Sequence, residues 1–281
     1  MSYASEYRVG FGAELDVSKL FVHVDDTENF DESSFAPVAE RFNKYGVAVL
    51  VCKERPEPRV NSVALKQYFG NVILHDRADE DGIVPIDPTD PIPGYLGSTC
   101  ADHPPHTDGA FSLEPEQVLT LQCVVATTDG GMTQLVSGDS AYDYMARKHP
   151  KLLPALFRPD AMSIQRTGIR CLRPIFNWVG GRVQMVYRED DVAATLIHPE
   201  SAEAFSVLRE FIIDPDNIVE FRLQPDWIVV LDNLRLLHGR TAFPTSQARR
   251  MNRLNFDGTG PFGRYLSFGI IPAFSELAEA A

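Results

Sequence analysis

Three side chains that can bind a metal ion occur as a close pair and one distant member. His106 and Asp108 are separated by a single residue, and His238 follows far downstream. Two imidazoles and one carboxylate can occupy one triangular face of an octahedral metal ion and leave the other positions open. The trio therefore predicts a metal centre to which small molecules can bind directly.

The backbone around the close pair must be extended for its two side chains to meet. Side chains two apart on a strand point to the same face, whereas a helix separates them. The prolines just before His106 exclude a helix there, and Gly109 allows the chain to turn after Asp108. The pair is therefore expected on a strand or at its exit. Together with His238 it has the donor set of non-haem Fe(II) oxygenases, which indicates an enzyme that uses oxygen.

The distant histidine comes shortly after an apolar run and is followed by arginines. Residues 227–232 are rich in β-branched side chains and predict a buried strand before His238. Arg249 and Arg253 follow on a strand-like stretch, where their spacing places them on one face. An arginine presents a planar, permanently charged fork that matches a carboxylate. Two of them beside a metal would hold a small dicarboxylate.

Four segments together resemble the Fe(II)- and 2-oxoglutarate-dependent dioxygenases of the taurine dioxygenase, clavaminate synthase and γ-butyrobetaine hydroxylase group. The matching segments are HTDGAF at 106–111, GGMTQLVSG at 130–138, WIVVLDNLRLLHGRTAF at 227–243 and the arginines after it. The resemblance spans roughly residues 40–260, almost the whole chain.

The resemblance implies Fe(II), 2-oxoglutarate as cosubstrate, and O2. The implied iron ligands are His106, Asp108 and His238. The remote carboxylate of 2-oxoglutarate would be held by Thr133 and by Arg249, which lies eleven residues after the distal histidine (249 − 238 = 11). Arg253 is expected near the carboxylate at the metal end.

The implied reaction splits 2-oxoglutarate to succinate and carbon dioxide while an aliphatic C–H bond of a small metabolite is hydroxylated. Halogenating relatives carry a small residue in place of the metal-binding carboxylate, so Asp108 disfavours halogenation. Desaturation, cyclisation and epimerisation use the same metal ligands and remain open. A hydrolase with another divalent metal is an alternative, although it would not need a dicarboxylate clamp. A jelly-roll metal-binding protein without catalysis is another, but no ligand or clamp position is broken.

Four residues are candidates for substrate contacts. Asp102 could meet an amine and Arg188 a carboxylate, which would suit an amino acid or a related zwitterion in specialised metabolism. The simpler interpretations are an exposed loop aspartate and a surface arginine. Tyr187 and Tyr95 are the other two candidates, and His103 and Phe111 are weaker ones.

The order of elements predicts a mostly β fold with flanking helices, and the resemblance implies a double-stranded β-helix, a distorted jelly roll. The 281 residues are compatible with a single domain over 1–281. The segment 85–105 is rich in proline and glycine, so we expect it to lack regular structure and to form a lid on the active site. Expected helices are 31–45, 61–69 capped by Asn61, 137–149 capped by Asp139 or Ser140, and 199–213; expected strands are 47–52, 118–126, 163–170, 182–188, 218–223, 227–232 and 249–256.

Composition limits the classes of partner. The formal net charge of −13 disfavours nucleic acid, which binds clusters of lysine and arginine. No apolar run approaches the ~20 residues of a membrane span, and the N-terminus lacks a signal-peptide pattern. The four cysteines are widely spaced, as expected of reduced thiols in a cytoplasmic protein. A small-molecule substrate is the expected partner, and a homo-oligomer is compatible with these features.

Overall fold

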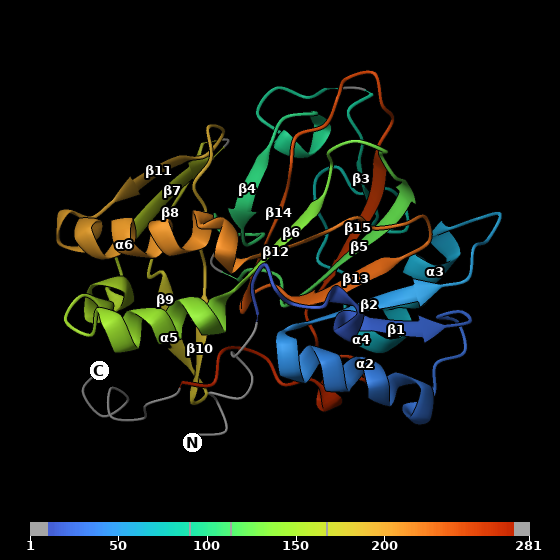
Figure 1. Ribbon diagram of the computed structural model, residues 1–281, viewed down its shortest axis with the longest axis horizontal. Coiled ribbons are helices and arrows are strands. Elements are labelled where there is room, and N and C mark those ends of the chain that lie inside the picture. Colours follow the sequence, from blue (N-terminus) through green and yellow to red (C-terminus); the bar gives the residue numbers. More distant parts are fainter. Residues whose placement is uncertain (1–10, 90, 113, 167, 273–281) are drawn as a thin grey trace.

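The computed structural model describes residues 11–272, apart from positions 90, 113 and 167. Strands predominate in this part of the chain and a few helices pack around them (Figure 1), which confirms the prediction of a mostly β fold with helices. None of the helices described is long and apolar enough to span a bilayer. All four cysteines are free thiols, in agreement with their spacing.

The largest sheet has six strands and is covered on both faces. Its order is β1 (Phe21–Val24), β2 (Val47–Cys52), β13 (Ile228–Asp232), β5 (Val118–Val125), β15 (Arg250–Phe256) and β3 (Val84–Ile86). Ala48 and Leu50 of β2 pack with α2 (Glu32–Tyr45), whereas Val47 and Val49 pack toward a second sheet. Burial on both faces explains why β2 and β13 are almost uninterrupted apolar runs.

The second sheet has four strands and carries two of the three predicted metal ligands, His106 and His238. Its order is β12 (Ile218–Phe221), β6 (Thr133–Ser137), β14 (Leu236–Arg240) and β4 (His103–His106). Leu135 and Leu236 pack against Val229 and Leu231 of the six-stranded sheet. The two sheets therefore enclose one apolar layer.

The expectation that segment 85–105 lacks regular structure is wrong. The segment includes most of β3, the 3₁₀ turn η2 (Leu96–Ser98) and most of β4. β4 accommodates two prolines because it lies at the edge of its sheet, where a strand can lack N–H donors. Its pairing with β14 is correspondingly irregular.

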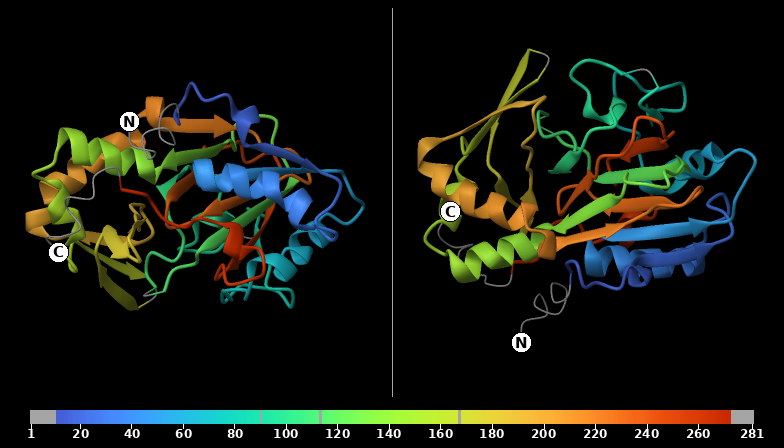
Figure 2. Two further views of the ribbon diagram at one scale, coloured as in Figure 1. Left: turned by 90° about the horizontal axis from the view of Figure 1, so that it is seen from below. Right: turned by 45° about the horizontal axis from the view of Figure 1, so that its top comes forward.

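A third group of elements lies beside the two sheets. It contains a three-stranded sheet of β11 (Ala194–Ile197), β7 (Met162–Arg166) and β8 (Ile169–Arg173), and a hairpin of β9 (Phe176–Val179) and β10 (Arg182–Met185). The helices α5 (Gly138–Lys148) and α6 (Ala202–Ile213) lie next to each other and bury an apolar cluster with these strands (Figures 1 and 2). Three 3₁₀ turns accompany them: η3 (Leu153–Phe157), η4 (Pro199–Ser201) and η5 (Pro215–Asn217).

Three expected elements have different bounds in this group. The stretch 163–170 belongs to two strands, β7 and β8, because Gly168 adopts φ +84° and allows the chain to reverse. The expected strand 182–188 ends at Met185. The expected helix 199–213 begins as the turn η4 and becomes α-helical at Ala202.

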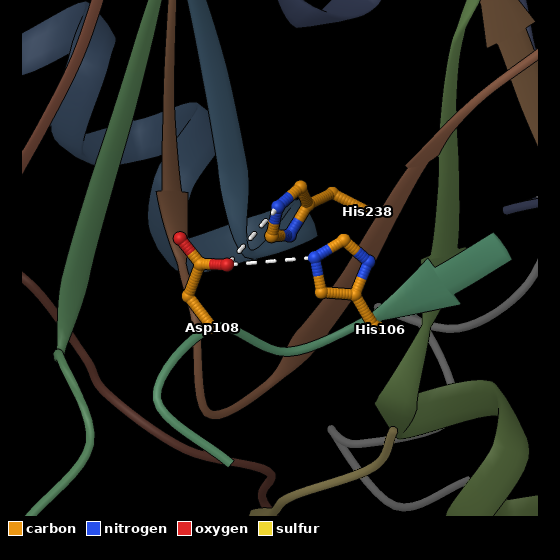
Figure 3. A group of neighbouring side chains, drawn as sticks. All are labelled: His106, Asp108 and His238. Atoms are coloured by element: carbon orange, nitrogen blue, oxygen red, sulfur yellow. Dashed lines mark ion pairs between the residues drawn. The ribbon is translucent and has the colours of Figure 1, made fainter. Parts of the chain in front are cut away.

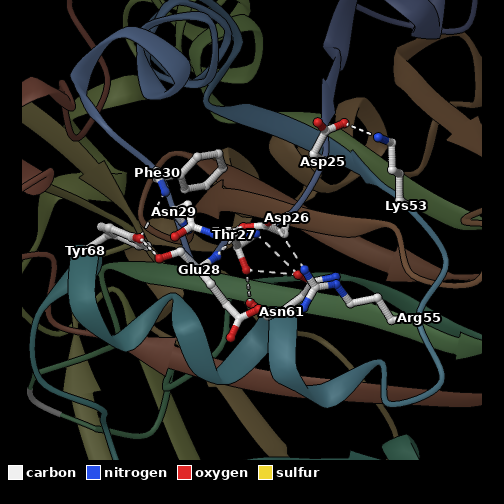
Figure 4. A network of polar contacts seen from close by, with 10 residues as sticks. All are labelled: Asp25, Asp26, Thr27, Glu28, Asn29, Phe30, Lys53, Arg55, Asn61 and Tyr68. Carbon is white, nitrogen blue, oxygen red and sulfur yellow. Dashed lines mark hydrogen bonds and ion pairs between the residues drawn. The ribbon is translucent and has the colours of Figure 1, made fainter.

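The loop between β1 and α2 is held by two short helices, α3 (Arg59–Ala64) and α4 (Lys66–Phe69) (Figure 4). Asn61 lies inside α3 and is not its cap; its side-chain oxygen accepts from the backbone N–H of Thr27. The Tyr68 hydroxyl donates to the carbonyl of Glu28 and accepts from the N–H of Phe30. These buried contacts fix the loop against α3 and α4.

The 3₁₀ turns η1 (Val17–Leu20) and η6 (Gly263–Tyr265) lie near the two ends of the described chain.

A buried ion pair connects α5 to the rest of the fold. Arg235 Nε donates to Asp139 Oδ2 at 2.6 Å, and both side chains are almost fully buried. The same guanidinium donates to the carbonyl of Asn43 near the C-terminus of α2. Because the Asp139 carboxylate is engaged here, the cap of α5 is Ser137, which accepts from the N–H of Ser140. The predicted caps Asp139 and Ser140 are therefore wrong.

We expect Arg235→Met to lower the free energy of unfolding by about 3–5 kcal/mol, because it leaves the buried Asp139 carboxylate without its partner. Urea denaturation followed by circular dichroism measures the loss. Arg264→Met is the control, since Arg264 forms an exposed pair with Glu32 and its removal should cost far less. The double variant Arg235→Met/Asp139→Leu should recover part of the loss; equal effects of the two single variants would contradict this role.

Candidate metal centre

The three predicted metal ligands come from two paired strands of the four-stranded sheet and from the turn that follows one of them. His238 in the middle of β14 pairs directly with His106 at the end of β4, and Asp108 follows two residues after His106. One ligand atom of each side chain lies within 4.8 Å of those of the other two, and all three residues are buried. Figure 3 shows the side chains pointing toward a common point. Strand pairing therefore brings together residues that are far apart in the sequence.

Hydrogen bonds determine which ring nitrogen faces this point. His106 Nδ1 lies 2.9 Å from the carbonyl oxygen of Pro104, which can only accept, so Nδ1 carries the proton. His106 Nε2 is then free and lies 3.4 Å from Asp108 Oδ1. His238 Nε2 lies 3.9 Å from the same oxygen. Two imidazole nitrogens and one carboxylate oxygen thus converge.

The carboxylate of Asp108 is held from two sides. Its Oδ2 accepts from Arg253 Nη1 at 2.7 Å, which leaves Oδ1 facing the histidines. The backbone N–H of Asp108 donates to Asn233 Oδ1 at 2.8 Å, and Asn233 Nδ2 donates back to the Asp108 carbonyl at 3.0 Å. Asn233 was not singled out from the sequence. Its position, a buried polar residue directly after the apolar run 227–232, was the signal that could have identified it.

The charges at the centre suit a divalent cation. Burial tends to raise the pKa of Asp108, but the Arg253 guanidinium opposes this effect, and the pKa lies well below its usual value. Burial, together with neighbouring His106, lowers the pKa of His238 to about 3. At neutral pH the carboxylate is charged and the His238 imidazole is neutral, as metal binding requires. The residues present therefore fit an ion that takes imidazole and carboxylate ligands.

The residues expected to hold the cosubstrate lie in the same cavity. Thr133 opens β6 and Arg249 immediately precedes β15; both are buried, and both line the cavity together with Arg253. Burial lowers the pKa of Arg249 to about 10, so its guanidinium remains charged at neutral pH. Its guanidinium carbon lies 5.9 Å from the ring centre of Phe243, and no carboxylate of the described residues forms an ion pair with it. A buried cation without a partner is suited to an anionic ligand.

The glycine turn before Thr133 makes room for Arg249. Gly131 adopts φ +63°, and a Cβ at this position would lie 2.6 Å from Thr127 Oγ1 and 3.2 Å from Arg249 Cδ. Only glycine combines this conformation with such close approach. Close packing against Thr127 and Arg249 thus explains the glycine at position 131, two residues before Thr133.

The structure brings two of the four substrate candidates into the cavity. Tyr95 and Arg188 line it, and Arg188 is only 4% exposed and hence not a surface arginine. Asp102 and Tyr187 line a separate groove instead. The Tyr187 hydroxyl donates to Glu189 Oε2 at 3.0 Å. Successive side chains of an extended backbone point to opposite sides, so Tyr187 and its neighbour Arg188 face different spaces.

Three polar residues of the cavity, His75, Glu116 and Arg166, were missed in the sequence because they belong to no recognisable motif. The weaker substrate candidates His103 and Phe111 both line the cavity.

We expect Asn233→Ala to weaken the affinity for Mn(II) by about tenfold to a hundredfold, because Asp108 loses the contacts that orient its backbone. Isothermal titration calorimetry under anaerobic conditions measures the change. Asn29→Ala, in an exposed turn, serves as the control. An unchanged affinity in Asn233→Ala would rule out this positioning role.

Comparison with known proteins agrees with the geometry. The model of the family described as "Taurine catabolism dioxygenase TauD, TfdA family" matches residues 5–255. A putative alpha-ketoglutarate-dependent taurine dioxygenase from Burkholderia xenovorans is similar in structure, with 20% identity, a TM-score of 0.64 and coverage of 86% of this chain and 88% of that one.

Two other solved structures are similar over most of their length. PvcB, an Fe, alpha-ketoglutarate-dependent oxygenase from an isonitrile synthetic pathway, has 19% identity, a TM-score of 0.61 and coverage of 84% of this chain and 85% of that one. An asparagine oxygenase in complex with Fe(II), 3-hydroxyasparagine and succinate has 16% identity, a TM-score of 0.58 and coverage of 84% and 93%. Because the family model matches most of the chain, the chain belongs to the TauD/TfdA family and is a 2-oxoglutarate-dependent non-haem iron dioxygenase, which confirms the predicted family, enzyme class and cofactors.

Proposed function

We propose that this enzyme hydroxylates an aliphatic C–H bond of a small metabolite, an amino acid or related zwitterion. Fe(II) would be bound by His106, Asp108 and His238, the three buried ligands that converge at one end of the cavity. The observation that carries this proposal is that the same cavity also contains Thr133 and Arg249, a buried cation for which the described residues provide no carboxylate partner. A metal site and a dicarboxylate site thus share one enclosed space.

The cosubstrate would lie between the metal and Arg249. The Arg249 guanidinium and the Thr133 hydroxyl would bind its remote carboxylate, because both are buried and face the cavity. Arg253 would add positive charge at the metal end while it orients Asp108. When bound, the iron and 2-oxoglutarate supply the oxygen activation, and the protein's side chains position the reactants and exclude water.

The cavity also offers what a zwitterionic substrate needs. Arg188 could meet a carboxylate, and Glu116 presents a buried Oε2 atom without a hydrogen-bond partner among the described residues, which could meet an amine. Phe111, Leu121 and Met251 provide apolar surface for a carbon skeleton. In this proposal Glu116 takes the amine-binding role that the sequence suggested for Asp102.

The architecture and the lid are part of the same proposal. The six-stranded and four-stranded sheets would be the two sides of a double-stranded β-helix in a single domain, with the metal site at its open end. Segment 85–105 would act as the lid, because Tyr95, Leu96 and Gly97 line the cavity. Ser98 stabilises this segment by accepting from the N–H of Ile92 at 2.8 Å and donating to the carbonyl of Tyr95 at 2.9 Å.

Asp108→Ala should abolish oxygen-dependent succinate formation, because the carboxylate ligand is lost and a buried cation, Arg253, is left unpaired. The measurement is succinate release from 2-oxoglutarate by the Fe(II)-loaded enzyme, after anaerobic formation of the visible charge-transfer band of the chelate. Asp216→Ala, at an exposed turn, should retain wild-type release. Undiminished release in Asp108→Ala would exclude the metal assignment.

Arg249→Ala should raise the 2-oxoglutarate concentration needed for half-maximal band formation by about tenfold or more, since a charged hydrogen bond to the cosubstrate is removed. The adjacent Arg250→Ala is a matched control, because Arg250 is exposed and does not line the cavity. If both variants bind 2-oxoglutarate like the wild type, Arg249 does not hold the cosubstrate.

A further inference from the structure

Two arginines of the cavity take no part in the iron or cosubstrate sites. Arg166 is at the end of β7, and Arg188 follows β10. Both line the cavity that contains the metal ligands. Their chain segments belong to the third group of elements and not to the sheet that carries Arg249 and Arg253. They therefore face the cavity from a different side of the fold.

Neither arginine is fully engaged within the described part of the chain. Arg188 Nε forms an ion pair with Asp190 Oδ2 at 2.7 Å, but neither of these two atoms has a hydrogen-bond partner among the described residues. Arg166 donates to the carbonyl of Gly94 at 3.3 Å and has no carboxylate partner among the described residues. Its guanidinium lies 5.1 Å from the ring centre of Phe111. Free N–H donors are thus available on both side chains.

The two guanidiniums are close enough to influence each other. Burial and the positive charge of Arg188 both lower the pKa of Arg166. Two cations that repel each other in a partly dry site are stabilised by an anion placed between them. Among the described residues, Asp190 is the carboxylate in ion-pair contact with Arg188, through Nε, and it is not part of the cavity lining.

The charges of the residues that line the cavity also favour an anionic ligand. Its lining includes five arginines and two carboxylates, which leaves three positive charges; Asp190 beside Arg188 and Asp102 near Arg240 reduce this excess to one. The two positive charges of Fe(II) and the two negative charges of 2-oxoglutarate cancel. An excess of positive charge therefore remains after the cofactors are bound, and uncompensated buried charge is costly.

We propose that Arg166 and Arg188 form an anion-binding subsite that holds a carboxylate, or a similar oxyanion, of the substrate. The proposal rests on the proposed function of this cavity as the oxygenase active site, and it makes a small organic acid the substrate class. Tyr95 and Phe111 flank Arg166, with ring centres 5.8 and 5.1 Å from its guanidinium carbon, and provide apolar walls for the attached carbon skeleton. The acid group would anchor the molecule on this side of the cavity.

Binding of charged and neutral probes of the same shape tests the subsite. Hexanoate, 3-phenylpropanoate and the primary amide of each are titrated anaerobically into enzyme loaded with Fe(II) and saturating 2-oxoglutarate, which blocks the Arg249 site. Calorimetry and the shift of the charge-transfer band report binding. We expect each carboxylate to bind at least about tenfold more tightly than its amide, because only the carboxylate accepts charge-assisted hydrogen bonds.

Variants of the two arginines test whether they cause this difference in affinity between carboxylates and amides. Arg166→Gln and Arg188→Gln should each reduce carboxylate affinity by about tenfold and leave amide and 2-oxoglutarate binding unchanged. Arg170→Gln, on an exposed position of β8, is the control and should behave like the wild type. Arg166→Gln breaks no ion pair among the described residues, so it remains informative even if Arg188→Gln, which removes the partner of Asp190, is poorly folded.

Three results would overturn the subsite: amides that bind as tightly as carboxylates, carboxylate binding that is unaffected in Arg166→Gln, or no carboxylate binding while the band forms normally. Absence of the band in the wild type would count against the proposed function instead. Calorimetry with Mn(II) in place of Fe(II) would then still decide whether carboxylates are preferred over amides.

Discussion

The ion pair between Asp108 and Arg253 is the interaction on which the centre depends. Burial alone would favour the protonated form of Asp108, which is a poor metal ligand. Arg253 comes from β15 of the six-stranded sheet, whereas Asp108 follows β4 of the four-stranded sheet. The pair therefore keeps the carboxylate charged and also connects the two sheets at the edge of their shared apolar layer.

Pairing of β4 with β14 supplies the second constraint. It sets His106 opposite His238, and the hydrogen bond of His106 to Pro104 turns the free nitrogen toward Asp108. Neither strand could hold this geometry alone, because each is short and β4 lies at a sheet edge. The apolar layer behind them, which includes Leu135 and Leu236, provides the rigidity that a preorganised metal site requires.

Much of this arrangement could be predicted from local sequence. The apolar run before His238 and the alternation around Arg249 depend only on neighbouring residues, and the structure has Arg249, Met251 and Arg253 all facing the cavity. Predictions failed where a distant contact decided the outcome. Asp139 was expected to cap α5, but the buried Arg235 engages it instead. Segment 85–105 was expected to be irregular, but edge pairing made part of it a strand.

The sequence by itself determined the types of chemical group, their spacing and the family, because donor atoms and local periodicity are properties of the chain. Only the tertiary structure decided which side chains share the cavity. Asp102 lies close in sequence to His106 yet lines another groove, whereas His75 and Arg166 line the metal cavity from distant parts of the chain. The physical reason is that cavity walls form where sheets and loops pack together, and sequence distance carries no information about that packing.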